Sequence, residues 1–141
     1  MAGRHARNDA GFTLVEMLVV LGIIVLLAAM VAPQVIRYLG TAKSQTAAIQ
    51  LKNIESALEL YYLDEGQYPS QNDGLKALVE QPANAPAWHG PYLKKGSGTV
   101  DPWGRPYLYK QPGEHGNFDL SSLGRDGQAG GEGEDRDLQN W

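Results

Sequence analysis

Apolar residues are distributed very unevenly along this chain of 141 residues. Residues 12–36 contain one charged side chain, Glu16, and are otherwise almost entirely apolar. Further along, apolar residues recur at spacings of four and three, at Ala47, Leu51, Ile54, Leu58 and Tyr61. The pattern predicts one long helix over residues 12–63, apolar on every side at first and amphipathic later. Pro33 is the expected position of a kink or a melted turn, because proline removes a backbone donor.

The remainder of the chain, residues 64–141, is rich in turn-forming residues. Alternating apolar and polar positions predict short antiparallel strands here, and a turn at residues 72–74 predicts a short helix after it. The expected elements are a helix over residues 75–80, strands over residues 105–110 and 117–122, and an edge strand over residues 91–95. The predicted fold class is therefore α+β, with one long helix laid across a small antiparallel sheet.

The apolar segment is long enough to span a bilayer, since about 20 apolar residues suffice. Arg4 and Arg7 precede it, which predicts a cytoplasmic N-terminus and places everything after Arg37 outside the inner membrane. A cleaved secretory signal peptide fits poorly, because the apolar core is too long and no A-x-A site ends it. We therefore expect a single-pass inner-membrane protein with a periplasmic domain.

Composition excludes several other classes. The net charge of −4 argues against a nucleic-acid partner. The absence of cysteine excludes disulfides and thiolate metal sites. Neither the serines nor the three histidines form a nucleophile–base constellation in the sequence pattern, so no enzymatic activity is predicted.

A lone carboxylate in an apolar helix is costly, by about 2.5–3.5 kcal/mol at a bilayer centre, so Glu16 needs a partner. Residues 11–16 (GFTLVE) resemble the cleavage signature of type IV prepilins and pseudopilins. The resemblance implies that a prepilin peptidase cuts between Gly11 and Phe12 and that Phe12 becomes N-methylated. It also implies that Glu16 serves assembly, by pairing with the new α-amine of Phe12 on a neighbouring subunit.

Further motifs are similar to the G-type major pseudopilins of type II secretion, a branch of the type IV pilin-like superfamily. These motifs are residues 61–69 (YYLDEGQYP), 74–79 (GLKALV), 101–104 (DPWG), 112–116 (PGEHG) and 122–127 (SLGRDG). The implied organisation is a leader peptide over residues 1–11, a transmembrane and assembly helix over 12–36, a periplasmic helical half over 37–63, and a globular domain over 64–141.

The last thirty residues carry seven acidic residues against two arginines. A solvated tail is the simplest interpretation, but glycines between the acids let the chain turn sharply, and oxygen ligands suit Ca²⁺. The family resemblance implies calcium binding in this loop, which makes the site residues Asp126, Asp135 and Asp137, with the carbonyls of Leu123 and Gln128. Glu132 and Glu134 stay open as substitutes.

The function implied is that of a structural subunit that polymerises into a helical pseudopilus driving protein export across the outer membrane. The implied partners are further copies of the chain, minor pseudopilins, the prepilin peptidase, the inner-membrane assembly platform with its ATPase, and membrane lipid. The alternatives are a type IV or competence pilin subunit, and a membrane-tethered periplasmic calcium-binding domain that never polymerises.

Overall fold

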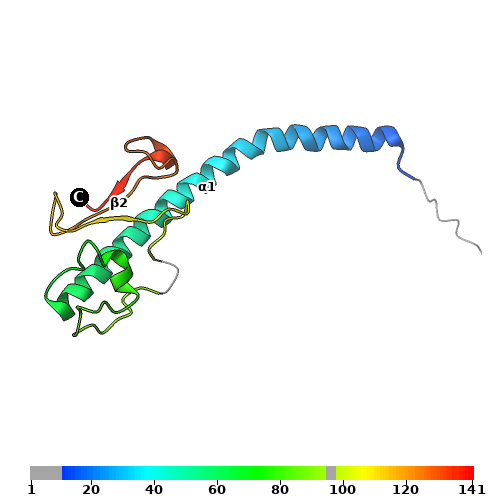
Figure 1. The fold of residues 1–141 in the computed structure, drawn as a ribbon. Helices are drawn as coiled ribbons and strands as arrows, with labels where there is room; N and C mark the ends of the chain where they lie inside the picture. Colours follow the sequence, from blue (N-terminus) through cyan, green and yellow to red (C-terminus); the bar gives the residue numbers. More distant parts are fainter. Residues whose placement is uncertain (1–10, 95–97) are drawn as a thin grey trace, which may run out of the picture. The chain divides into compact units, whose positions relative to one another are not determined.

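The computed structural model describes residues 11–94 and 98–141, so the predicted leader peptide lies outside the described residues except for Gly11. The chain divides into two compact units, of which the first ends at Tyr38 and the second runs from Leu39 to Trp141 (Figure 1). Helix α1 (Leu14–Glu65) supplies residues to both units, and every other element belongs to the second.

Helix α1 begins and ends two residues later than the apolar pattern predicts. Its C-terminal end is set by Gly66, which adopts φ of +71° and donates its N–H to the carbonyl of Tyr62 (2.8 Å). A glycine in this left-handed conformation is a common helix stop. The helix continues through Pro33 as α-helix, so the melted turn that proline chemistry favours is not formed there.

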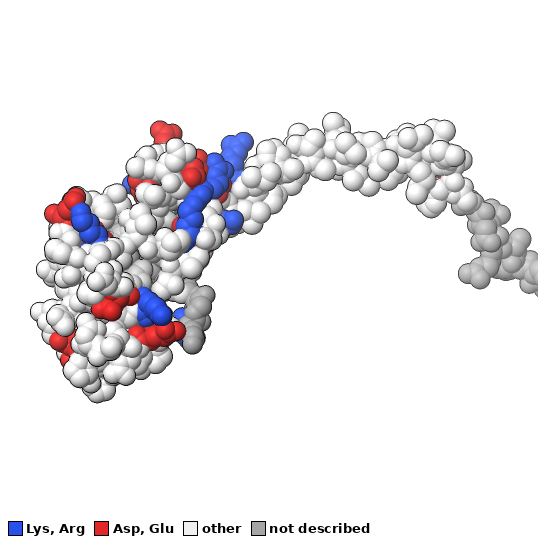
Figure 2. All heavy atoms as spheres, in the orientation of Figure 1, with Lys and Arg blue, Asp and Glu red and all other residues white. Residues whose placement is uncertain are grey.

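The first unit presents its apolar side chains outward. Leu14, Leu26 and Met30 are each at least 70% exposed, and Figure 2 shows almost no charged atoms on this segment. By length and composition, α1 is the one helix among the described residues that is able to cross a membrane. Exposure of such a large apolar surface to water is unfavourable, so lipid or other helices are expected to cover it.

The predicted apolar stripe on α1 is buried in the second unit. Leu51, Ile54 and Leu58 are no more than 4% exposed and belong to one hydrophobic core with Tyr107 and the strand residue Leu120. The hydroxyl of Tyr107 lies 3.0 Å from the carbonyl of Ala47, which ties the sheet to the helix backbone. The stripe therefore docks the helix onto its own domain, as predicted.

The sheet has three antiparallel strands in the order β1 (Leu108–Lys110), β2 (Asp119–Ser122) and β3 (Leu138–Gln139). Tyr109 pairs with Leu120 across β1 and β2, and Ser122 pairs with Leu138 across β2 and β3. The first two strands lie within the predicted ranges. The third strand was not predicted.

Two further expectations need correction. The expected helix over residues 75–80 is the short 3₁₀ helix η1 (Gly74–Leu78). The expected edge strand over residues 91–95 is wrong for its described residues, 91–94, because this segment bonds elsewhere. Tyr92 and Leu93 both donate their N–H groups to the carbonyl of Leu78 (2.8 and 3.1 Å), so they close onto η1 rather than onto the sheet.

The acidic end of the chain is folded. It contains the short 3₁₀ helix η2 (Gly133–Asp135), which is followed directly by β3. Residue Glu134 of η2 packs against Gly40 of α1, where an added Cβ would collide with the glutamate side chain. Glycine at position 40 therefore allows the acidic loop to approach the helix closely.

Candidate functional site

The N-terminal motif forms a capping box at the start of α1. Thr13 precedes the first helical residue, and its N–H and hydroxyl both donate to the Glu16 carboxylate (2.8 and 3.1 Å). The N–H of Glu16 in turn donates to the Thr13 hydroxyl (3.2 Å). Reciprocal bonds of this kind satisfy backbone donors that the first helical turn leaves free.

The capping box changes the interpretation of Glu16. Sequence reasoning treated its carboxylate as a group without a partner, whereas three local hydrogen bonds involve Glu16 before any second subunit is present. The signal was in the sequence, because Thr13-x-x-Glu16 ahead of an apolar run is a capping-box pattern. These bonds satisfy the carboxylate in part, but they supply no opposite charge.

The bond between Gly11 and Phe12 lies just outside the helix. Both residues are exposed, Phe12 to 82%, and neither has helical structure. An added Cβ at Gly11 would meet nothing within 4 Å. A protease needs an accessible backbone outside regular secondary structure, and this position provides one.

The second candidate site is the loop from Leu123 to Asp137, which contains all the predicted calcium ligands. The carbonyl of Leu123 accepts a hydrogen bond from Gly127 (3.2 Å). The Asp126 side chain accepts the N–H of Gln128 (3.0 Å), and the Asp137 side chain accepts the N–H of Gly130 (2.9 Å). The loop therefore uses two of the predicted ligand side chains to fix its own backbone.

Asp135 has a different partner from the other two aspartates. Both of its carboxylate oxygens accept hydrogen bonds from Arg125, at 2.8 Å each. These bonds to Asp135, helped by the nearby charge of Glu134, raise the pKa of the Arg125 guanidinium. This ion pair was not expected from the sequence, because a motif of acids and glycines does not say which acid faces the neighbouring arginine.

The loop contains oxygen ligands of the type that calcium prefers, but their side chains are not gathered around one position. Among residues 11–94 and 98–141, no three acidic or histidine side chains are arranged to hold a metal. The Oδ1 atom of Asp137 is nonetheless buried and has no hydrogen-bond partner within the described chain. A buried carboxylate oxygen without a donor is costly, so a cation is a suitable partner for it.

A charged scaffold supports the beginning of the loop. Arg105 donates from Nη1 to the carbonyl of Gly124 (2.6 Å), and its guanidinium packs against Gly127. Buried Asp101 accepts the hydroxyl of Ser122 (2.8 Å) and the N–H of Arg105 (2.8 Å). The end of β2 and the start of the loop are thereby held in one place.

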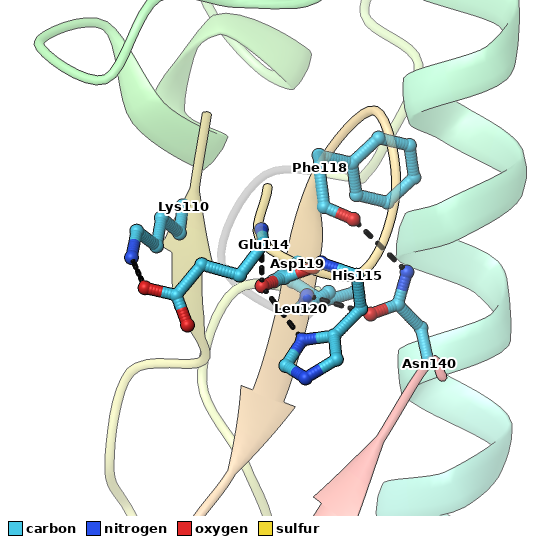
Figure 3. A network of polar contacts seen from close by, with 7 residues as sticks. All are labelled: Lys110, Glu114, His115, Phe118, Asp119, Leu120 and Asn140. Carbon is cyan, nitrogen blue, oxygen red and sulfur yellow. Dashed lines mark hydrogen bonds and ion pairs between the residues drawn. The ribbon is translucent and has the colours of Figure 1, made fainter. Parts of the chain in front are cut away.

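A second polar network fastens the end of the chain to β2 (Figure 3). The Asn140 side-chain oxygen accepts the N–H of Leu120 (2.8 Å), and the backbone N–H of Asn140 donates to the carbonyl of Leu120 (3.1 Å). Trp141 stacks on His115 with ring centroids 4.2 Å apart. The sequence pattern did not predict that the end of the chain bonds to the sheet.

Asp119 is the centre of this network. Burial raises its pKa, but hydrogen bonds from the backbone N–H groups of Glu114 and His115 outweigh that effect and hold the pKa below its usual range. The His115 ring lies 3.1 Å away and adds a further contact. Lys110 pairs with Glu114 at the rim of the same turn. The network stabilises the turn between β1 and β2.

Two family models match this chain. The model described as type II secretion system, protein G, matches residues 34–141. The model of the prokaryotic N-terminal methylation motif matches residues 6–32. The two matches meet near Pro33 and together cover both candidate sites.

Relatives are similar over nearly the full length. Type II secretion system core protein G of Pseudomonas aeruginosa is 48% identical over 139 residues, which cover 96% of each chain. The protein of the same name from Vibrio cholerae is 41% identical over 141 residues, which cover 98% of this chain and 95% of that one. The crystal structure of the major pseudopilin from the type 2 secretion system of enterohaemorrhagic Escherichia coli matches with a TM-score of 0.55 and 34% identity. That match covers 71% of this chain and 87% of the other.

These similarities confirm the predicted family and the predicted pilin-like α+β fold. The family consists of structural subunits rather than enzymes, as the sequence indicated. The apolar N-terminal helix and the methylation motif are consistent with an inner-membrane and periplasmic pseudopilus subunit. The chain belongs to the type II secretion system protein G family of major pseudopilins, and it carries the prokaryotic N-terminal methylation motif.

Proposed function

We propose that this chain is cut after Gly11, methylated at Phe12, and polymerised into a periplasmic pseudopilus that drives protein export across the outer membrane. The observation that carries this proposal is the exposed Gly11–Phe12 bond directly before an apolar helix that begins with the Thr13–Glu16 capping box. Before assembly, residues 12–36 span the inner membrane with the N-terminus in the cytoplasm, in keeping with the arginines that precede them.

Assembly exchanges lipid contacts for helix contacts. The first unit exposes apolar side chains on all sides of α1, so one surface suits both the bilayer and the centre of a helix bundle. A head-to-tail interface of this type is open and produces a fibre rather than a closed ring. The proposed partners are other copies of the chain, minor pseudopilins, the prepilin peptidase, and the assembly platform with its ATPase.

Substitution of Gly11 tests processing directly. We expect Gly11→Val to abolish cleavage, because a branched side chain at the cut bond blocks a peptidase that accepts glycine there. The fold is not expected to suffer, since space is open at this position. Intact-mass spectrometry after co-expression with a prepilin peptidase should find the wild type shortened to Phe12 and carrying one methyl group, and the variant unshortened.

Gly22→Ala is the matched control, because it lies in the same apolar segment and also has open space around it. It should be processed like the wild type. A wild-type chain that stays unprocessed, or a Gly11→Val chain that is still cut, would contradict the proposal and favour the membrane-tethered domain that never polymerises. A processed chain that forms long surface fibres instead of supporting secretion would favour a type IV or competence pilin.

We propose further that the loop from Leu123 to Asp137 binds calcium. Asp126, Asp135 and Asp137 are the proposed side-chain ligands, with carbonyls of Leu123 and Gln128. Support comes from the buried oxygen of Asp137, which has no hydrogen-bond partner in the part of the chain that the structure describes, and from an oxygen-only donor set without thiols. The ion would supply positive charge where the chain concentrates acids, and it would thereby stabilise the folded loop.

Calcium should therefore raise the melting temperature of the full chain in a non-ionic detergent. At a concentration of about 100 times Kd the gain is about 2.7 kcal/mol, which corresponds to a rise on the order of 10 °C for a domain of this size. Asp137→Asn should remove most of the rise, while Glu80→Gln, which removes an exposed acid outside the loop, should retain it. An equal rise in wild type and Asp137→Asn would argue against Asp137 as a ligand.

A further inference from the structure

The Asp135 carboxylate already has a full partner within the chain. Arg125 donates from Nε to Oδ1 and from Nη2 to Oδ2, each at 2.8 Å, so the two groups form a bidentate pair. The same guanidinium lies 3.7 Å from Glu134 through Nη1. Bidentate arginine–carboxylate pairs are stronger and more directional than ordinary surface ion pairs.

The pair explains why the proposed ligands do not converge in this structure. Each Asp135 oxygen that accepts a hydrogen bond from Arg125 has one of its lone pairs directed at the guanidinium, whose positive charge also repels a cation on that side. Asp137, in contrast, keeps one buried oxygen that has no hydrogen-bond partner among the described residues. A cation that binds Asp135 on the side of the guanidinium must therefore displace Arg125.

The surrounding backbone permits this exchange without unfolding. The N–H of Arg125 donates to the carbonyl of Glu134 (2.8 Å), so the two arms of the loop are joined independently of the arginine side chain. That side chain is 55% exposed, so it is able to move into solvent when the ion pair opens. The exchange therefore involves one side-chain rotation and leaves the backbone link in place.

We propose that Arg125 competes with calcium for the Asp135 carboxylate and thereby sets the calcium affinity of the loop. This inference rests on the calcium site proposed above. In the absence of metal, the guanidinium offsets repulsion among the acids of residues 126–137 and keeps the loop folded. When calcium binds, it displaces Arg125 from Asp135, and the cost of breaking the pair weakens the apparent affinity.

The test is calorimetric titration of the full chain with calcium chloride in a non-ionic detergent, comparing Arg125→Gln with Arg136→Gln. Arg136 follows Asp135 directly and forms no ion pair with any residue that the structure describes, so its removal changes the net charge equally without releasing Asp135. Arg125→Gln should bind calcium roughly 2- to 5-fold more tightly than Arg136→Gln, which is the range expected for an ion pair at the surface.

The melting temperature without metal is a second, independent readout. Arg125→Gln should melt below both the wild type and Arg136→Gln in chelator, because Asp135 then lacks its partner. Arg125→Lys keeps the charge but not the bidentate geometry, and it should fall between wild type and Arg125→Gln in both measurements. Equal or weaker calcium binding by Arg125→Gln relative to Arg136→Gln would overturn the competition while leaving the calcium site intact. No calcium binding by the wild type would overturn the site itself and the competition with it.

Discussion

Replacement of Glu16 by alanine is expected to abolish pseudopilus assembly while leaving membrane insertion intact. The carboxylate is the only charge in residues 12–36, so its removal makes insertion more favourable. Assembly should fail because the Phe12 α-amine of a neighbouring subunit then lacks its anionic partner in an apolar environment. The measurement is secretion of a substrate protein, together with filament formation by the overproduced chain.

The capping box provides a second explanation for such a loss, and Glu16→Gln separates the two. Glutamine retains the hydrogen bonds to Thr13 that cap α1, but it carries no charge. If intermolecular charge pairing is the essential role, Glu16→Gln should fail to assemble like Glu16→Ala. Normal assembly of the glutamine variant would show that helix capping suffices, and normal assembly of the alanine variant would remove both roles.

The long helix and its buried face were predictable because they depend on local periodicity. The stripe from Ala47 to Tyr61 repeats at helical spacing over four turns, and the structure buries all of it. Strands β1 and β2 were predictable for a similar reason, since they alternate and flank a turn. Their lengths were overestimated, because pairing partners rather than alternation decide where a strand ends.

Strand β3 was not predictable from its own residues. It is two residues long, and it exists because Asn140 bonds to the backbone of Leu120, twenty residues earlier. Sequence pattern does not encode a pairing across that distance. The same limit applies to Asp135, whose pairing with Arg125 depends on how η2 folds back on the start of the loop. The capping box was different, because its four-residue pattern was fully local.

Strong base should unfold the second unit, because two buried tyrosine hydroxyls ionise more readily in the unfolded chain. Tyr107 and Tyr109 are 4% and 9% exposed, and their hydroxyls lie near the backbone carbonyls of Ala47 and Pro69. Burial raises the pKa of both groups. The charge of Asp101 adds to the effect for Tyr107, and neighbouring tyrosines add to it for Tyr109. Both phenols therefore stay protonated in the folded chain at a pH where the unfolded chain ionises them.

The sign of the effect follows from proton linkage. The stabilisation is complete below the unfolded pKa of about 10, and it is lost as the pH rises from there toward the raised folded pKa. Above that pH, each phenol lowers the free energy of unfolding by about 1.4 kcal/mol per pH unit. The two together therefore lower it by about 5 kcal/mol by about pH 12. A loss of that size is comparable to the whole stability of a small domain, which is typically about 5–15 kcal/mol.

Tyr107→Phe should reveal this contribution in melts of the full chain followed by near-ultraviolet circular dichroism. At neutral pH the variant should be less stable by about 1 kcal/mol, because it lacks the hydroxyl near Ala47. Above about pH 10 its stability should fall less steeply than that of the wild type, since one fewer proton is released on unfolding. Tyr62→Phe removes a phenol that is 42% exposed, and it should keep the wild-type slope. Parallel curves for wild type and Tyr107→Phe would mean that ionisation of this phenol does not drive alkaline unfolding.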